Sequence, residues 1–313
     1  IYRSSFFISI PENYIKDLEN LPEEVKVLGI NDYLFIDGYE RLLREKTENN
    51  RLRNIKLLLP VVEFRIAKFS GVDFGSFKRI NLHVIFSNEL SPELIKSQFL
   101  NAIQQDYKLE AGANGASWSG VITKESLESL GASIKASVPE EQLSKYGSDL
   151  AEGFRNINVD ECQLFQKLEG NSFLKGKYLI AVGKTEWDSL KWTDSSISTK
   201  KDIINKADVV FVASESPEKY QSAHKKLTEQ SVNNLLLDCS DAHSFSTSNE
   251  KDRIGNCFTW IKADTTFNGL KQILNEPSER VFVGDLPESI KRVQNNKTKV
   301  IDAVEVTKKP DSQ

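Results

Sequence analysis

Short hydrophobic runs, separated by polar turns, repeat along the first part of the chain. Four of them are rich in branched or aromatic residues and are predicted to be strands: Phe6–Ile10, Val25–Ile30, Ile55–Val62 and Ile80–Phe86. Asp37–Glu48 instead spaces its apolar residues along one helix face. Pro60 argues against a central position for the third run, because proline cannot donate a ladder hydrogen bond. The pattern therefore predicts strands that alternate with helices.

The middle of the chain has a more helical pattern. Pro92–Gln105 follows Ser91, a residue type that caps helix N-termini. Ala111–Gly120 is rich in Gly, Ser and Asn and is predicted to be a surface loop. Three further helices are predicted in this part: Glu125–Ala136, Glu140–Arg155 and Val159–Leu168. Residues 91–170 are therefore expected to form a helical insertion in the middle of the fold.

The alternation of strands and helices then resumes. The predicted strands are Tyr178–Val182, Val209–Ala213, Leu235–Asp238 and Arg280–Val283. The predicted helices are Ile197–Lys206, Pro217–Leu227 and Phe267–Leu274. Strands separated by helices imply an α/β fold with a mostly parallel sheet. A closed barrel and an open doubly wound sheet both fit this pattern.

Composition and charge narrow the function classes. The chain has 313 residues, 39% of them hydrophobic, and a formal net charge of −4. This charge argues against a strongly basic domain that binds duplex DNA, but it leaves room for a nucleic acid at a metal site or a local basic patch. No run of about 18 apolar residues occurs, so no membrane partner is expected.

The spacing of the cysteines and the lack of glycine-rich motifs argue against other classes of protein. Cys162, Cys239 and Cys257 show no regular spacing, which argues against a disulfide framework and for a reducing compartment. We therefore expect a cytoplasmic location. The sequence contains neither GxxxxGK[ST] nor GxGxxG, so it lacks the fingerprints of a nucleotide P-loop and of a dinucleotide site.

The sharpest candidate for chemistry is an Asp-x-His pair directly after a predicted strand. Asp241 and His243 follow the apolar run Leu235–Leu237, and strand ends are where active sites form in barrels and open α/β sheets. A carboxylate and an imidazole so close in sequence can both bind one divalent metal. The alternative is that Asp241 caps the next segment and His243 is an ordinary loop residue.

Three more titratable residues lie at or near the ends of predicted strands: Asp32, Glu63 and His83. If the sheet is parallel, these ends meet Asp241 and His243 at one edge. Mixed oxygen and imidazole ligands are typical of hydrolytic Mn, Fe or Zn sites. Each residue also has an ordinary interpretation: Asp32 as a turn residue, His83 as a core histidine, and Glu63 as the ion-pair partner of nearby Arg65.

Two basic residues are candidates for binding a phosphate near such a metal. Lys184 follows the predicted strand Tyr178–Val182, and Arg253 lies a few residues beyond His243. The alternatives are a solvated helix start for Lys184 and a solvated charged loop for Arg253.

These pieces together resemble a known family. Ser240–His243 (SDAH) and Lys251–Pro277 closely resemble the end of the PHP (polymerase and histidinol phosphatase) module in TrlF-like PHP–ATPase proteins. Other pieces resemble the same module in the right order: Gly29–Tyr39, Leu59–Arg65, Ile80–Phe86 and Val182–Trp192. The resemblance covers most of residues 1–287.

The resemblance implies a fold and an activity. It implies a distorted (β/α)7 PHP-type barrel over residues 1–287, with metals at the strand ends and hydrolysis of phosphoesters in nucleotides or nucleic acids. Asp241 and His243 match the closing ligands, Glu63 resembles a bridging carboxylate, and His83 a further ligand. The resemblance makes Glu63 and Asp241 the catalytic pair. Residues 288–313 then form a tail or a linker toward an ABC/SMC-like ATPase domain, within a DNA-acting or phage-defence protein.

The chain also departs from the family pattern. Phe7 and Ser9 stand where a His-x-His pair belongs, and a common Asp-His is here Asp32-Tyr33. A three-metal site cannot be built from these residues. Two interpretations stay open: a metal-dependent phosphoesterase with one or two ions, or a degenerate PHP domain without metal that binds nucleic acid, a nucleotide or a partner protein. A further interpretation is that the chain is an α/β protein unrelated to the PHP family.

Overall fold

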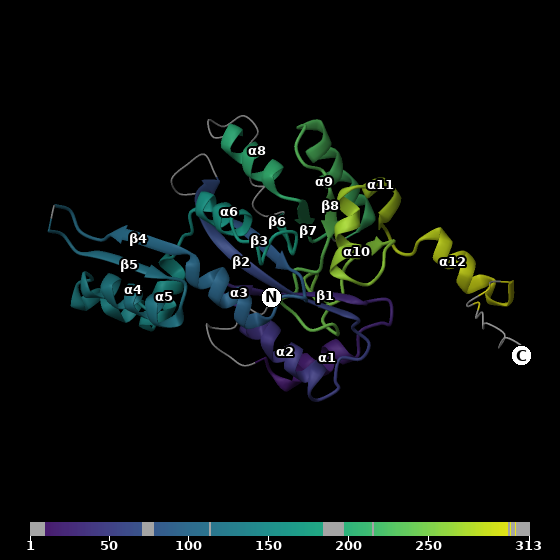
Figure 1. The fold of residues 1–313 in the computed structure, drawn as a ribbon, viewed down its shortest axis with the longest axis horizontal. Helices are drawn as coiled ribbons and strands as arrows, with labels where there is room; N and C mark the ends of the chain where they lie inside the picture. The colour runs from purple at the N-terminus through teal and green to yellow at the C-terminus, as the bar shows by residue number, and fades with distance from the viewer. Residues whose placement is uncertain are drawn as a thin grey trace, which may run out of the picture.

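A curled six-stranded sheet forms the centre of the molecule (Figure 1). The computed structural model describes residues 10–70, 78–112, 114–183, 197–214, 216–299, 301 and 304. In the order β1-β2-β3-β6-β7-β8, the strands are β1 (Val27–Tyr33), β2 (Leu57–Ser70), β3 (Lys78–Phe86), β6 (Tyr178–Gly183), β7 (Val209–Val212) and β8 (Leu236–Asp238). The α/β class is confirmed. The described strands form a half-barrel, and closure into a seven-stranded barrel stays a prediction.

The sheet is parallel except for β3. The pairs β1–β2, β6–β7 and β7–β8 are parallel, whereas β3 is antiparallel to both β2 and β6. β2 ends at Ser70 and β3 begins at Lys78, and this separation is shorter than the crossover of about a dozen residues that a parallel pair needs. His83 therefore reaches the site from the middle of an antiparallel strand and not from a strand end.

Pro60 lies inside a central strand, contrary to the expectation from its missing N–H. It pairs with Ile30 of β1, while the ladder between β2 and β3 begins only at Val61. Pro60 therefore stands just before the antiparallel ladder, where no partner on that side needs its hydrogen bond. The predicted strand Phe6–Ile10 lies outside the described residues except for Ile10.

Helices cover one face of the sheet, which we call the α2 face. Those on this face are α1 (Glu12–Glu19), α2 (Asp37–Thr47), α3 (Pro92–Gln98), α6 (Glu161–Glu169), α8 (Ile197–Lys206) and α9 (Pro217–Glu229). Strand residues such as Val62, Phe64 and Val84 pack there and are fully buried. The alternation of side chains along a strand sends the residues between them to the other face.

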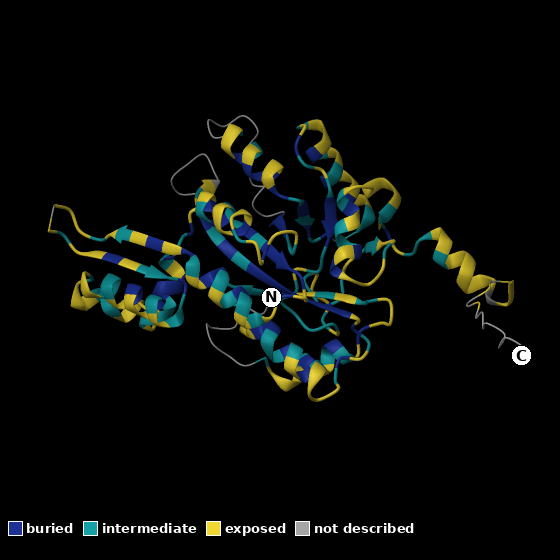
Figure 2. Ribbon diagram, in the orientation of Figure 1, coloured by how far each residue is buried: buried dark blue, intermediate teal, exposed yellow. Residues whose placement is uncertain are grey.

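The other face, which we call the α10 face, has a smaller apolar core. Leu59, Val61 and Ile85 pack there against Phe267 of α10 (Phe267–Lys271) and Ile273 of the turn η4 (Gln272–Leu274). This core ends at Val61 and Ile85, and the next residues on the same face are Glu63 and His83. Figure 2 shows the sheet mostly buried or half-buried between more exposed helices.

The segment between β3 and β6 is only partly helical. It holds α3, the turn η2 (Leu100–Ala102), α4 (Lys124–Ala136), η3 (Glu140–Lys145), α5 (Asp149–Asn156) and α6, but also the hairpin β4 (Gln104–Lys108) and β5 (Ser117–Val121). The prediction of a loop over Ala111–Gly120 was wrong in its second half, because β5 begins at Ser117. Trp118 of β5 is buried, and its ring stacks on that of Tyr107 in β4 with the ring centres 5.8 Å apart. The hairpin and its helices project from the sheet (Figure 1).

The C-terminal part begins with a small antiparallel sheet of β9 (Thr259–Ile261) and β10 (Val281–Val283), with α11 (Pro277–Arg280) between them. Beyond it, α12 (Glu288–Asn295) and the turn η5 (Lys297–Lys299) lead away from the molecule (Figure 1). No helix in the described part of the chain is long and apolar enough to cross a membrane.

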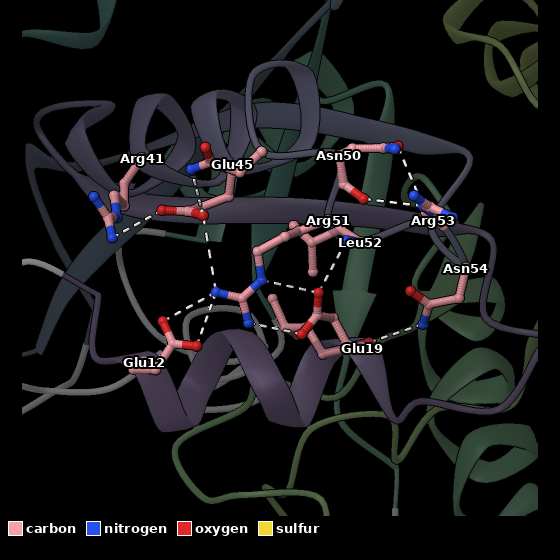
Figure 3. A network of polar contacts seen from close by, with 11 residues as sticks. Glu12, Glu19, Arg41, Glu45, Asn50, Arg51, Leu52, Arg53 and Asn54 are labelled. Atoms are coloured by element: carbon pink, nitrogen blue, oxygen red, sulfur yellow. Dashed lines mark hydrogen bonds and ion pairs between the residues drawn. The ribbon is translucent and has the colours of Figure 1, made fainter.

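A polar network fastens α1 to the turn that precedes β2 (Figure 3). The Arg51 guanidinium donates to both oxygens of Glu19, at 3.0 and 2.7 Å, and to Glu12 at 3.0 Å. It also lies 3.8 Å from the Glu45 carboxylate, which pairs with Arg41 on α2. One guanidinium thus joins α1, α2 and the turn, so this network has a structural role.

Candidate functional site

Polar side chains interrupt the α10 face where β1, β2 and β3 lie side by side. Tyr33 is opposite Glu63, and Glu63 is opposite His83, so these three share one face and one level of the sheet. All three keep some accessible surface, whereas Val62 and Val84 beside them are buried on the other face. The sheet register therefore brings together Glu63 and His83, two of the residues that the sequence singled out.

Two asparagines hold the Glu63 carboxylate. The Asn31 amide donates to one oxygen at 3.0 Å, and the Asn81 amide donates to the other at 2.8 Å. A carboxylate can accept about four hydrogen bonds, so Glu63 retains lone pairs for a cation or a donor. Among the described residues, the Glu63 carboxylate is held by these two amides and not by an ion pair with Arg65, which was the alternative.

The same asparagine sets the tautomer of His83. Because the Asn31 nitrogen donates to Glu63, its carbonyl oxygen must face His83, and Oδ1 lies 3.3 Å from His83 Nδ1. An amide oxygen only accepts, so Nδ1 carries the proton and Nε2 keeps its lone pair. His83 is thus oriented to offer Nε2 to a metal or to a proton.

Burial keeps this imidazole neutral. Loss of water around the ring lowers the pKa of His83 from its usual 6.5, and the nearby carboxylates of Glu63 and Asp241 offset only part of that effect. The Phe211 ring of β7, with its centroid 5.9 Å from that of His83, contributes to the enclosure. A neutral imidazole is the form that binds metals.

The loop after β8 brings Asp241 and His243 toward this cluster. Its start is fixed by the buried carboxylate of Asp238, which accepts from Ser214 N at 2.7 Å and from Phe258 N at 2.8 Å. Farther on, Ser246 donates to Asp17 of α1 through its backbone N, at 2.8 Å, and through its hydroxyl. The loop therefore runs from β8, at one edge of the sheet, to α1, beside the other edge.

Asp241 has a left-handed backbone, with φ of 42°, and its side chain is 55% exposed. Its Oδ1 lies 3.8 Å from His243 Nε2, so the two form a loose pair at the surface of the loop. The backbone N of His243 donates to Asp252 O at 2.7 Å, which fixes the main chain at this position. Asp241 and His243 are thus neighbours, and of the two carboxylates that influence His83, Asp241 is the one on a loop.

Asp32 is not brought to this cluster. One residue along β1 from Asn31, it points to the α2 face, where its Oδ2 accepts from Gly38 N at 2.9 Å and Tyr39 N at 3.2 Å. From its place near the end of β1, Asp32 therefore satisfies two amides in the first turn of α2. A Cβ on Gly38 would lie 2.5 Å from Asp32 Oδ1, so this close approach requires glycine. Burial outweighs the two amides and raises the pKa of Asp32 to about 7.

Of the two predicted phosphate-binding residues, the structure describes only Arg253. Lys184 lies outside the described residues. Arg253 belongs to the loop after β8, where it bridges to Ser244, and its guanidinium donates to Glu250 O at 3.2 Å. Arg253 therefore folds back on its own loop, as expected for a charged loop residue.

The described residues of the cluster do not by themselves form a complete metal site. Among the residues that the structure describes, no three or more His, Cys, Asp or Glu side chains are grouped so that they could hold a metal ion. Glu63 and His83 are in place, and Asp241 lies on a loop within electrostatic range of His83. A metal would thus require Asp241 to approach the pair.

Several residues of this face were not predicted to be site residues: Asn31, Tyr33, Arg65, Arg79 and Asn81. In β3, Arg79 and Asn81 alternate with buried apolar residues, as in Arg79-Ile80-Asn81-Leu82-His83. That alternation is a signal in the sequence that these side chains share one face of the strand with His83.

Comparison of the chain with family models, curated proteins and solved structures finds no match in any of the three.

Proposed function

We propose that this chain is a PHP-like module of the TrlF-like type, which binds a divalent metal and a phosphoester on the α10 face of its sheet. In this proposal the half-barrel belongs to a distorted (β/α)7 barrel. The observation that supports it most is the pair of Glu63 and His83, opposite each other in the β2–β3 ladder and fixed by one asparagine. A carboxylate and a neutral imidazole with a free Nε2 fit Mn, Fe or Zn.

Each residue of the site has a definite role in this proposal. Glu63 and His83 would be the rigid ligands, because Asn31 and Asn81 fix the carboxylate and Asn31 fixes the ring. Asp241 would complete the set from the loop, with His243 beside it. When bound, the metal supplies a water of lowered pKa that can attack a phosphoester. The set supports one ion and at most two.

The same proposal covers the rest of the protein. The substrate would be a phosphoester of a nucleotide or a nucleic acid, and the module would act in the cytoplasm. A C-terminal ABC/SMC-like ATPase domain would follow residues 288–313 and couple the module to DNA or to phage defence. The substrate and the ATPase domain are proposed from the sequence resemblance, and the cytoplasmic location from the irregular spacing of the cysteines.

A second candidate is a degenerate PHP domain that binds a nucleotide, a nucleic acid or a partner without chemistry. Two observations favour it. The described residues contain no assembled group of three ligands, and amides already occupy both oxygens of Glu63. Phe7 and Ser9, in place of the family's histidines, point in the same direction.

Hydrolysis assays on the Asp241→Asn variant separate the two candidates. For the first candidate, wild-type protein supplied with Mn or Zn releases phosphate from a nucleotide or a DNA end, and Asp241→Asn reduces the rate at least about a hundredfold. Asp285→Asn, which removes an exposed charge elsewhere, serves as the control and keeps the rate. Absence of hydrolysis in the wild type, with ligand binding retained by Asp241→Asn, would establish the scaffold.

A further inference from the structure

The polar surface of the α10 face extends beyond Glu63 and His83 toward two arginines. Arg65 follows Glu63 at the next inward position of β2 and pairs with Asn81, while Arg79 precedes Asn81 at the next inward position of β3. Both arginines keep some accessible surface, whereas Phe64, Ile66 and Ile80 beside them are buried. The two guanidiniums therefore continue the same surface, next to the Glu63–His83 pair.

The Arg65 guanidinium lies over an aromatic ring. Its guanidinium carbon lies 4.7 Å from the centre of the Tyr33 ring, and the Tyr33 hydroxyl donates to Phe154 O of α5 at 3.3 Å. A stacked guanidinium uses its face for the ring and keeps its N–H donors in the plane. The Tyr33 ring thus orients Arg65 while its edge remains able to bind a planar or tetrahedral anion.

Among the described residues, the Arg79 guanidinium makes one hydrogen bond, and a like charge lies nearby. Its guanidinium donates to Arg155 O near the end of α5, which uses one of five donors. Burial lowers the pKa of Arg79, and the charge of Arg65 lowers it further. Within the described part of the chain, neither arginine forms an ion pair with a carboxylate, and the Glu63 carboxylate nearby is hydrogen-bonded to two amides.

We infer that Arg65 and Arg79 form an anion subsite that holds a phosphate monoester beside Glu63 and His83. Two guanidiniums match a group with a charge of about −1.5 to −2 at neutral pH, and their planar forks suit its oxygens. An anion between them relieves their mutual repulsion. The inference rests on the proposed function, and it specifies the substrate class: an end that bears a terminal phosphate, and not an internal diester.

The subsite is tested without metal, in the full chain treated with chelator. The probes are orthophosphate, measured by calorimetry, and a short single-stranded DNA with a 5′-phosphate or a 5′-hydroxyl, measured by fluorescence anisotropy. The wild type binds orthophosphate and prefers the phosphorylated DNA. Arg65→Gln weakens orthophosphate binding about tenfold or more. Arg65→Lys keeps the charge but loses the planar fork of donors, so its affinity for orthophosphate lies between those of the wild type and Arg65→Gln.

Controls keep the test specific. Arg44→Gln removes an exposed charge from α2, on the other face of the sheet, and leaves both affinities unchanged. The phosphate affinity of Arg79→Gln is interpreted only together with the thermal stability of that variant, because Arg79 also contacts α5. The inference is overturned if the wild type does not bind orthophosphate, if Arg65→Gln binds it as the wild type does, or if both DNAs bind equally. Metal content is measured separately: a metal-free wild type that binds orthophosphate contradicts the proposed function and leaves the subsite intact.

Discussion

At the scale of single residues, Asn31 and Asp32 show how one position along a strand decides a role. Asn31 points to the α10 face, where it fixes Glu63 and His83, and Asp32 points to the α2 face, where it accepts from the first amides of α2. Both are polar residues near the end of the same strand, so their composition does not distinguish them. Alternation along the strand does, because it sends neighbours to opposite faces.

Asp32 provides a prediction about pH. Its pKa is about 7 in the folded protein and its ordinary value is 3.8, so the folded state binds the proton more tightly. The stability from Asp32 is therefore fully present below about pH 4 and is lost as the pH rises through 7. The Asp32→Asn variant keeps an oxygen for the α2 amides but has no carboxyl to titrate. We therefore expect urea unfolding to show that its unfolding free energy falls less than that of the wild type between these pH values.

The wild type and Asp32→Asn are compared across that range at constant ionic strength. If the difference in their unfolding free energies is the same at both ends of the range, the carboxyl titrates alike in the folded and unfolded chains, and the assigned burial of Asp32 is wrong.

At the scale of elements, the loop after β8 matters most for the candidate site, because it carries Asp241 and His243. It begins at the buried Asp238 and is fastened to α1 through Asp17 and Ser246. The element between these anchors carries Asp241 and His243. The position of α1 therefore influences the site, although α1 contributes no residue to it.

Asp17→Ala tests the anchor on α1. Loss of the two hydrogen bonds from Ser246 should destabilise the fold by only about 1–2 kcal/mol, but it should weaken binding of Mn or Zn about tenfold, because the loop that carries Asp241 is less ordered. Asp17→Asn retains one acceptor and should have a smaller effect. Equal metal affinity in the wild type and Asp17→Ala would show that the anchor does not position the loop.

Arg51→Ala tests how α1 itself is held. The change leaves Glu12, Glu19 and Glu45 near one another without the guanidinium that joins them, so we expect a lower midpoint of thermal unfolding and faster proteolysis within α1 (Figure 3). Arg53→Ala, whose guanidinium contacts only Asn50 among the described residues, is the matched control. An unchanged midpoint of thermal unfolding in Arg51→Ala would show that the network does not stabilise the fold.

At the scale of the whole molecule, the sequence predicted most elements but not how they meet. Ile197–Lys206 was predicted with both ends correct, because capping and periodicity are local signals. The antiparallel course of β3 and the hairpin β4–β5 were missed. Strand pairing depends on partners farther along the chain, as for Trp118, which is buried and pairs with Tyr107 of β4, and local patterns do not show such partners.

The candidate site was predictable to a similar degree. Glu63, His83, Asp241 and His243 stood out because titratable residues are rare beside apolar runs. Their supports did not stand out, because Asn31 and Asn81 acquire their meaning only from the register that places them around Glu63. The six-stranded sheet is thus a half-barrel with polar residues on one face, and the loop after β8 carries Asp241 and His243.

The measurement that tests the central claim most directly is the metal content of the purified protein after chelator treatment and resupply of Mn or Zn. Elemental analysis should find about one ion per chain in the wild type and in Asp32→Asn, and a loss of metal in Glu63→Gln and in the Asp241→Asn/His243→Ala double variant. A wild type without metal after resupply, or a double variant that keeps its metal, would contradict the account.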